Sequence, residues 1–162
     1  MKRFRFFLAF VAVGLLSSSS AFAAKYNQPS KGRDLISLSL EESGLEFQKL
    51  RKIKGHFSGG KWSDSVDKWM GRKHQVMLHL QQKLTSKRAN KHTITSIMGN
   101  PDIMVNYNDP QAPEFYLNTL SRELKQAGDE ILIYKWRGSH DFLYFVIREK
   151  KQLKSDWWMA LE

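Results

Sequence analysis

The sequence predicts an α+β domain, with two or three helices packed on a C-terminal antiparallel sheet of three or four strands. Three runs rich in β-branched and aromatic residues support this prediction, and they span residues 131–136, 142–147 and 153–161. Two short polar breaks, residues 137–141 and 148–151, separate the runs. Apolar runs of this length with such connectors are typical of consecutive antiparallel strands. The helical segments upstream can cover one face of the sheet, which gives a two-layer domain.

The first 23 residues have the three-part pattern of a secretory signal peptide. A basic start is followed by an uncharged apolar run over residues 6–16 and by the small-x-small sequence Ala21-Phe22-Ala23. The apolar run is too short to span a bilayer as a stable helix. We therefore expect a cleaved signal peptide over residues 1–23, and a periplasmic or secreted mature chain without a transmembrane segment.

Two further segments follow the expected cleavage site. Residues 24–34 are polar, contain Pro29 and Gly32 and show no periodicity, so they are expected to form a flexible leader. The remaining residues, 35–162, have the length of a single domain.

The charge of the chain favours an anionic partner. The whole chain has 26 basic and 16 acidic residues, and residues 24–162 retain an excess of +7. Such an excess favours anionic surfaces such as nucleic acid, phospholipid headgroups or acidic polysaccharides, and also suits a soluble basic surface without a ligand. A protein partner or an anionic ligand of the cell envelope is expected, and nucleic acid is not. The basic residues fall into three groups: Lys49, Arg51, Lys52 and Lys54; Lys87, Arg88 and Lys91; Arg148, Lys150, Lys151 and Lys154.

The chain contains no cysteine. The domain must therefore be held by packing alone, without disulfides. Thiol catalysis, cysteine-type zinc sites and a lipidated cysteine are excluded as well. The five histidines lack the paired spacing, with an adjacent glutamate, of a helical zinc site. We expect neither a metal nor a cofactor.

The N-terminal half of the domain is predicted to contain one strand and then helices. Residues 35–40 alternate apolar and polar side chains, which suits a short edge strand. Residues 45–54 are expected to form a short helix. Ser63 is a plausible N-cap of a helix over residues 63–70. Gly71 is expected to break that helix before a second segment, in which Val76, Met77, Leu80 and Leu84 form an apolar stripe.

The middle of the chain is expected to continue with a short helix and a strand. Thr93 can cap a helix that ends at Gly99 in the left-handed conformation, and Pro101 prevents its continuation. Residues 103–107 suit a short strand. After a loop, residues 114–126 show the spacing of another amphipathic helix.

Two polar clusters are the candidate functional residues. The sequence Gly71-Arg72-Lys73-His74 is expected at a helix N-terminus, which binds anions readily. The sequence Trp136-Arg137-Gly138-Ser139-His140-Asp141 is expected at a hairpin turn, where functional side chains often lie. Together they give the candidate binding residues Arg72, Lys73, His74, Trp136, Arg137, His140 and Asp141.

A catalytic interpretation of these clusters is possible beside a structural one. Arg72, Lys73 and Arg137 would clamp an anionic substrate, and His74 or His140 would act as a base oriented by Asp141 or Asp67. In the structural interpretation, Asp141 satisfies turn N–H groups, Gly138 supplies a positive φ, and His140 hydrogen-bonds within its loop.

Aromatic residues offer a second kind of surface. Five tryptophans are present, and rings of this kind can stack on ligands. Trp157 and Trp158 are adjacent in a predicted strand, so they should face opposite sides of the sheet.

Part of the sequence resembles a known family. The unit Ile94-x-x-Ile97-Met98-Gly99-x-Pro101-Asp102, followed by Tyr134-x-Trp136-x-Gly138, resembles the small outer-membrane assembly lipoproteins of the SmpA/OmlA (BamE-like) class. The resemblance implies short helices on an antiparallel sheet, a BamE-like or BLIP-like two-layer fold, and a role in binding rather than catalysis. The chain differs from that family in lacking the lipidated cysteine and in having the additional predicted helix over residues 114–126.

A longer pattern is similar to small proteins without an assigned function. It includes Gly71-Arg72-Lys73-His74-x-Val76-Met77 and Trp136-Arg137-Gly138-x-His140-Asp141-Phe142-Leu143-Tyr144-Phe145, and it suggests that the two polar clusters belong to one unit. The leading hypothesis is an exported, non-enzymatic binding or envelope-assembly module. The alternative is a small hydrolase or transferase that acts on an anionic substrate through His74 or His140.

Overall fold

The computed structural model describes residues 34, 37–107, 109 and 126–160. Every described residue lies in the unit that spans residues 33–162. The helix expected over residues 114–126, apart from Gln126, and most of its preceding loop lie outside the described residues. No helix within the described ranges is long and apolar enough to cross a membrane.

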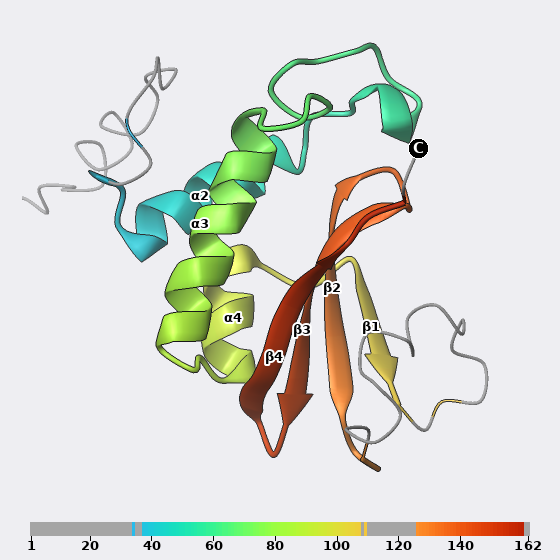
Figure 1. The fold of residues 1–162 in the computed structure, drawn as a ribbon. Helices are drawn as coiled ribbons and strands as arrows, with labels where there is room; N and C mark the ends of the chain where they lie inside the picture. The colour runs from blue at the N-terminus through green and yellow to red at the C-terminus, as the bar shows by residue number, and fades with distance from the viewer. Residues whose placement is uncertain (1–33, 35–36, 108, 110–125, 161–162) are drawn as a thin grey trace, which may run out of the picture. The chain divides into compact units, whose positions relative to one another are not determined.

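The described elements form an α+β arrangement, as the sequence predicts (Figure 1). Helices come first along the chain and strands last. They are α2 (Leu40–Leu50), the 3₁₀ helix η2 (His56–Ser58), α3 (Arg72–Ser86), α4 (Lys91–Met98), β1 (Ile103–Asn106), β2 (Glu130–Arg137), β3 (Asp141–Arg148) and β4 (Lys151–Trp158).

The strands form one antiparallel sheet in the order β1-β2-β3-β4. The three apolar runs of the C-terminal quarter are β2, β3 and β4, and residues 103–106 form the short strand predicted before them. Gly138 turns the chain between β2 and β3 with a φ of 54°, as expected for a glycine in a tight turn. The sheet register shifts between Val146 and Ile147, which marks a bulge at the start of β4.

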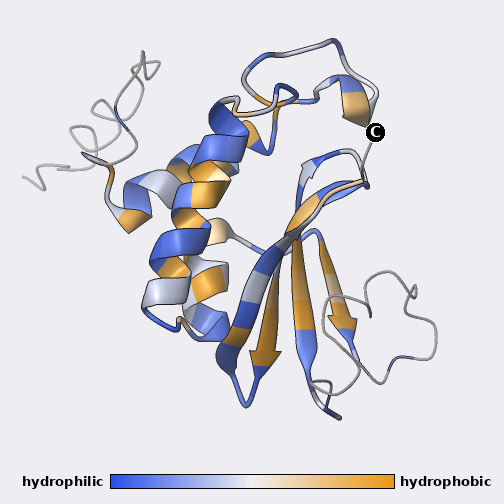
Figure 2. Cartoon of the chain, viewed as in Figure 1, coloured by the Kyte–Doolittle hydropathy of each residue, from blue (hydrophilic) through white to orange (hydrophobic). Residues whose placement is uncertain are grey.

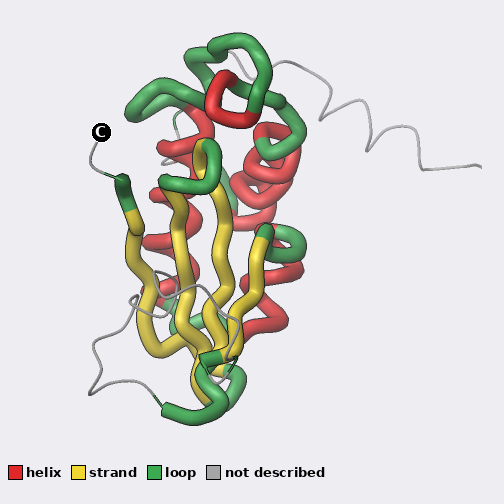
Figure 3. Tube along the Cα trace, turned by 90° about the vertical axis from the view of Figure 1, so that its right-hand side faces the viewer, coloured by secondary structure: helices red, strands yellow, loops and turns green. Residues whose placement is uncertain are grey.

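The helices pack on one face of the sheet, as Figures 1 and 3 both show. Alternate residues of β2 and β3 point to this face, and Leu132, Tyr134 and Phe145 are fully buried there with the apolar stripe of α3. The opposite face carries a second buried cluster that includes Ile133 and Phe142. Figure 2 shows hydrophobic residues along β1, β2 and β3. The core is therefore built on both faces of the sheet.

The two adjacent tryptophans of β4 confirm the predicted alternation. Trp157 packs against the cluster below the helices, and Trp158 packs against the cluster on the other face.

Helix α2 begins earlier than the sequence pattern predicts. Ser39 and Glu42 form a capping box, in which each side chain accepts a hydrogen bond from the other residue's backbone N–H. The edge strand expected over residues 35–40 is therefore wrong for the described residues, since Leu40 already belongs to the helix. The helix expected to start at residue 45 is five residues longer at its beginning. The capping box stabilises a helix here more than the short alternation favours a strand, because it satisfies two backbone N–H groups that have no partner within the helix.

The segment before α3 is a loop rather than the expected helix. Ser63 does not cap a helix; instead its carbonyl accepts turn hydrogen bonds from Val66 and Asp67. The Asp67 carboxylate accepts the N–H groups of His56 and Ser63, which holds the segment in a closed loop. Gly71 is the N-cap of α3, and the stripe of Val76, Met77, Leu80 and Leu84 is buried as predicted.

Helix α4 is capped by Asn90 rather than by Thr93. The Asn90 side chain accepts a hydrogen bond from the Thr93 N–H, so the helix begins at Lys91. Gly99 has the expected positive φ of 79°, but its ψ of −178° is extended rather than left-handed helical. Its carbonyl accepts a hydrogen bond from the Tyr134 hydroxyl, which ties the end of α4 to β2.

Candidate functional site

The two polar clusters predicted from the sequence meet in the structure. The Lys73 Nζ donates to the main-chain oxygen of Trp136 over 2.5 Å. The His74 ring stacks on the Trp136 indole, with centroids 4.3 Å apart and planes inclined by 16°. The N-terminus of α3 therefore lies against the end of β2, and the clusters form one unit.

The two arginines of the expected anion clamp are engaged in ion pairs. Arg72 binds both carboxylate oxygens of Glu46 on α2, at 2.5 and 2.8 Å. Arg137 donates from Nε to Asp141 over 2.5 Å and from Nη1 to the Asp67 carbonyl over 3.3 Å. Both guanidinium groups thus join elements of the fold to one another.

The third cation of the expected clamp is buried. Lys73 is only 8% exposed, and Trp136 O is its hydrogen-bond acceptor among the described residues. Burial away from water lowers the pKa of its ammonium group to about 8, although the charge of Asp102 acts in the opposite direction. Lys73 is therefore inaccessible to a large anionic ligand in this conformation.

His74 is enclosed by aromatic rings. Trp69 and Trp157 lie 4.5 and 5.0 Å from its centroid, in addition to the stacked Trp136. Its Nδ1 accepts the Met70 N–H over 3.2 Å, so the proton of the neutral ring lies on Nε2. Burial, followed by the positive charge of Arg137, lowers the pKa of His74 to about 4. The ring is therefore neutral at pH 7.

His140 lies apart from this stack, exposed in the turn between β2 and β3. No hydrogen bond joins it to His74 within the described ranges. The two carboxylates proposed to orient a base have other partners. Asp141 accepts from Arg137 and from the Ala160 N–H at 3.0 Å, and Asp67 accepts the two loop N–H groups described above. Of the structural interpretation, the positive φ of Gly138 is confirmed, whereas Asp141 binds Arg137 and the Ala160 N–H instead of turn N–H groups.

A connected row of rings was missed by the sequence analysis. We call it the aromatic ladder, and it consists of Trp62, Phe57, Trp136 and Trp69. Trp62 lies 6.2 Å from Phe57, and Trp69 lies 5.6 Å from Trp136. The Arg137 guanidinium joins the two pairs, because it lies 4.7 Å from the Phe57 centroid and 4.4 Å from the Trp136 centroid.

The two ends of the aromatic ladder are open to solvent. Trp62 is 55% and Trp69 is 58% exposed, and Met70 beside Trp69 is 47% exposed. The loop between α2 and α3 supplies three of the four rings, and Figures 1 and 3 show this loop at the same end of the molecule as the β2–β3 turn. Two tryptophans seven residues apart in a glycine-rich segment were the available signal, but only the fold connects them.

In the described part of the chain, no group of three or more His, Asp or Glu side chains is placed to hold a metal ion. Comparisons with protein-family models, with curated proteins and with solved structures gave no match to the chain.

Proposed function

We propose that the chain is an exported, non-enzymatic binding module that holds a protein partner of the cell envelope at the aromatic ladder and Met70. The observation that carries this proposal is the pair of half-exposed rings, Trp62 and Trp69, at the two ends of one connected stack. Large exposed apolar side chains in one place mark interaction surfaces.

The residue types suit a protein partner. Tryptophan, methionine and arginine are enriched in the centres of protein interfaces, and tryptophan and arginine dominate binding hot spots. The ladder presents both tryptophans with Met70, and Arg137 lies between its rings. Exposed Lys61 lies next to Trp62 in the same loop, whereas Lys68 pairs with the Asp64 carboxylate at 4.0 Å, so Lys61 favours an acidic residue of the partner beside Trp62.

The rings are held in place before binding. The Trp62 Nε1 donates to Asp64 over 2.7 Å, and Trp69 rests against His74 and Trp136. Binding therefore costs little side-chain entropy. In this proposal Lys73, His74 and Asp141 support the surface from below, and their role is to position the rings.

The geometry gives less support to a hydrolase or transferase. All three cations of the expected clamp have partners inside the fold, and His74 is buried with its Nδ1 occupied. A general base needs a free acceptor within reach of a substrate. The envelope location and an assembly role are supported by the signal-peptide pattern and by the resemblance to the SmpA/OmlA class.

The experiment is an affinity capture from the envelope fraction of the protein's own cells, followed by binding measurements with the purified partner. The test variant carries Trp62→Ser and Trp69→Ser. The matched control carries Met104→Ser and Leu45→Ser, which removes two other exposed apolar side chains. We expect the partner's Kd to rise by about 30-fold or more in the test variant, the effect of losing a hot spot.

The control should bind as the wild type does. The test variant should unfold at a lower denaturant concentration, because Trp69 packs on His74 and Trp136, so binding is measured without denaturant, where both variants are folded. Equal affinity of the test variant and the wild type would contradict the ladder as the contact surface. An equal loss of affinity in both variants would show that binding depends on surface hydrophobicity in general and not on the aromatic ladder.

A further inference from the structure

Two basic segments that lie far apart in the sequence are joined at the opposite end of the described sheet from the β2–β3 turn. The connection between α3 and α4 runs beside the start of β4. The Lys91 N–H donates to the Lys150 carbonyl over 2.9 Å, the Gln152 N–H donates to the Ala89 carbonyl over 3.2 Å, and Asn90 pairs with Lys151 as a β-bridge. The second and third basic groups of the sequence therefore merge into one surface.

Some of these cations are neutralised and others are not. Lys91 pairs with Glu130 at 2.7 Å, and Arg148 holds both carboxylate oxygens of Asp129 at 2.8 and 2.9 Å. Arg88 and Lys151 have no carboxylate partner among the residues that the structure describes. An unpaired positive charge therefore remains on each side of the bridge.

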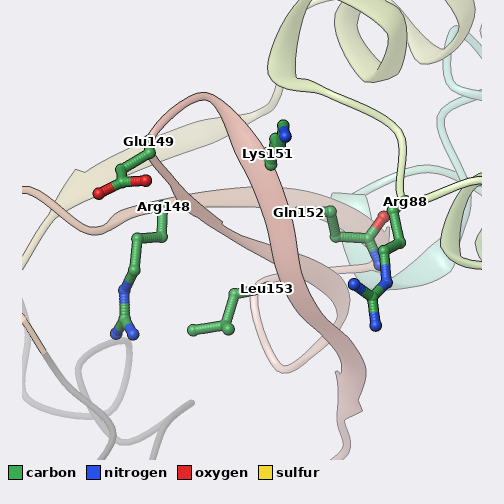
Figure 4. Close-up of a pocket in the computed structure, with 6 residues that line it drawn as sticks. All are labelled: Arg88, Arg148, Glu149, Lys151, Gln152 and Leu153. Carbon is green, nitrogen blue, oxygen red and sulfur yellow. The ribbon is translucent and has the colours of Figure 1, made fainter.

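A hollow of about 420 Å³ opens at this surface (Figure 4). Its lining contains three cations, one carboxylate, one amide and one apolar side chain: Arg88, Arg148, Lys151, Glu149, Gln152 and Leu153. Leu153 is the bulged residue of β4 and is 46% exposed. An apolar side chain beside cations suits an anion that carries an organic group better than a free inorganic ion.

Gln152 provides a second observation at the hollow. Its side chain is more than nine-tenths buried and donates from Nε2 to Thr85 over 2.9 Å. Its Oε1 has no hydrogen-bond partner within the described ranges. A buried acceptor without a donor is unfavourable. Gln152 Oε1 is therefore a buried acceptor at the hollow that the described residues leave unsatisfied.

Charged residues also occupy strained backbone positions here. Arg88, Glu149 and Lys150 have φ values of 45°, 48° and 67°, a region in which glycine or asparagine is favoured. Three such residues gather in the two turns that border the hollow. Strain of this kind is often kept where a side chain has a function.

We propose that this hollow binds the phosphate group of an organic phosphate, with Arg88 and Lys151 as the direct cationic contacts and Leu153 against the organic part. The absence of an aromatic ring in the lining argues against stacked nucleobases. This site is separate from the aromatic ladder, and it does not depend on the function proposed above.

The test measures binding of glycerol 1-phosphate to the full-length protein by calorimetry. A parallel arm measures flotation with phosphatidylcholine vesicles, with and without phosphatidic acid. The test variant is Arg88→Gln with Lys151→Gln. The control is Lys52→Gln with Lys54→Gln, two exposed lysines, so the change in net charge is equal.

We expect saturable, salt-sensitive binding that weakens by at least about tenfold in the test variant and is unchanged in the control. Binding in the soluble arm identifies a small phosphate ester as the ligand, and binding in the vesicle arm alone identifies a lipid headgroup. Equal weakening in both variants, or no saturable binding in either arm, would overturn the proposal. Arg88→Gly separates binding from folding, because it should weaken binding while raising the unfolding temperature.

Discussion

His74 makes the stability of this domain depend on pH in the acidic range. The neutral ring is enclosed by Trp69, Trp136 and Trp157, and its Nδ1 accepts a backbone hydrogen bond from Met70. Burial and the charge of Arg137 lower its pKa from 6.5 to about 4 in the folded protein. Protonation of His74 therefore destabilises the folded protein.

The sign follows from the proton count of the two states. Between pH 6.5 and 4 the unfolded chain binds a proton at His74 and the folded protein does not. Acidification therefore favours unfolding, and the contribution of His74 is complete above pH 6.5 and is lost as the pH falls toward 4. A shift of this size corresponds to at most about 3 kcal/mol of unfolding free energy.

The assay is urea unfolding between pH 7.5 and 4, for the wild type and for His74→Phe and His74→Asn. The phenylalanine variant keeps a ring in the stack, and the asparagine variant keeps an acceptor near the Nδ1 position. Neither titrates. Both should lose about 3 kcal/mol less than the wild type across this range, whatever their stability at pH 7.5. The other four histidines are common to all three proteins and cancel in the difference. Parallel pH profiles for the wild type and both variants would refute the reasoning.

Three further predictions concern single positions. The pKa of Lys73 is about 8 in the folded protein, whereas the unfolded chain keeps the proton up to about pH 10.5, so the unfolding free energy of the wild type should rise by about 2 kcal/mol from pH 8 to 9.5. Urea unfolding of Lys73→Met should show no such rise. A rise retained in the variant would mean that another group causes it. Gly44→Ala should destabilise by about 1–3 kcal/mol, because a Cβ there would lie 2.5 Å from the Ile97 carbonyl oxygen; wild-type stability in thermal unfolding would show that α2 and α4 can separate without cost. Lys150→Gly should stabilise the β3–β4 turn by about 1 kcal/mol, since its φ is 67°; Lys151→Gly, at a position within β4, serves as the control and should destabilise.

The sequence was most informative where one periodicity continues over a whole element. The β-branched and aromatic runs of β2 and β3 and the apolar stripe of α3 each repeat over several residues, so the identity and facing of these elements follow from local pattern. The opposite orientation of Trp157 and Trp158 follows in the same way. Patterns that cover only a few residues predicted the structure less well. Six alternating residues suggested a strand where the capping box of Ser39 and Glu42 begins a helix.

The sequence also identified the two polar clusters without their roles, and it missed Trp62, Phe57 and Trp69 of the aromatic ladder. It grouped Arg72, Lys73 and His74 with the turn at Arg137, and the two groups do meet. It could not show that Glu46 neutralises Arg72 or that Lys73 is buried against the Trp136 carbonyl. These contacts join residues 26 and 63 positions apart, and local patterns do not encode which distant groups pack together.

The sequence by itself thus determined the strands of the C-terminal quarter and the apolar stripe of α3, because side-chain periodicity acts over neighbouring residues. The helix starts before α3 and the caps did not follow from it. Only the tertiary structure decided which charges remain unpaired and which rings reach solvent. The joining of Trp62 to Trp69 through Phe57, Arg137 and Trp136, and the meeting of Arg88 with Lys151 across a β-bridge, depend on how the elements pack. Packing is set by burial of the whole core, so surfaces that combine distant segments appear only in the folded chain.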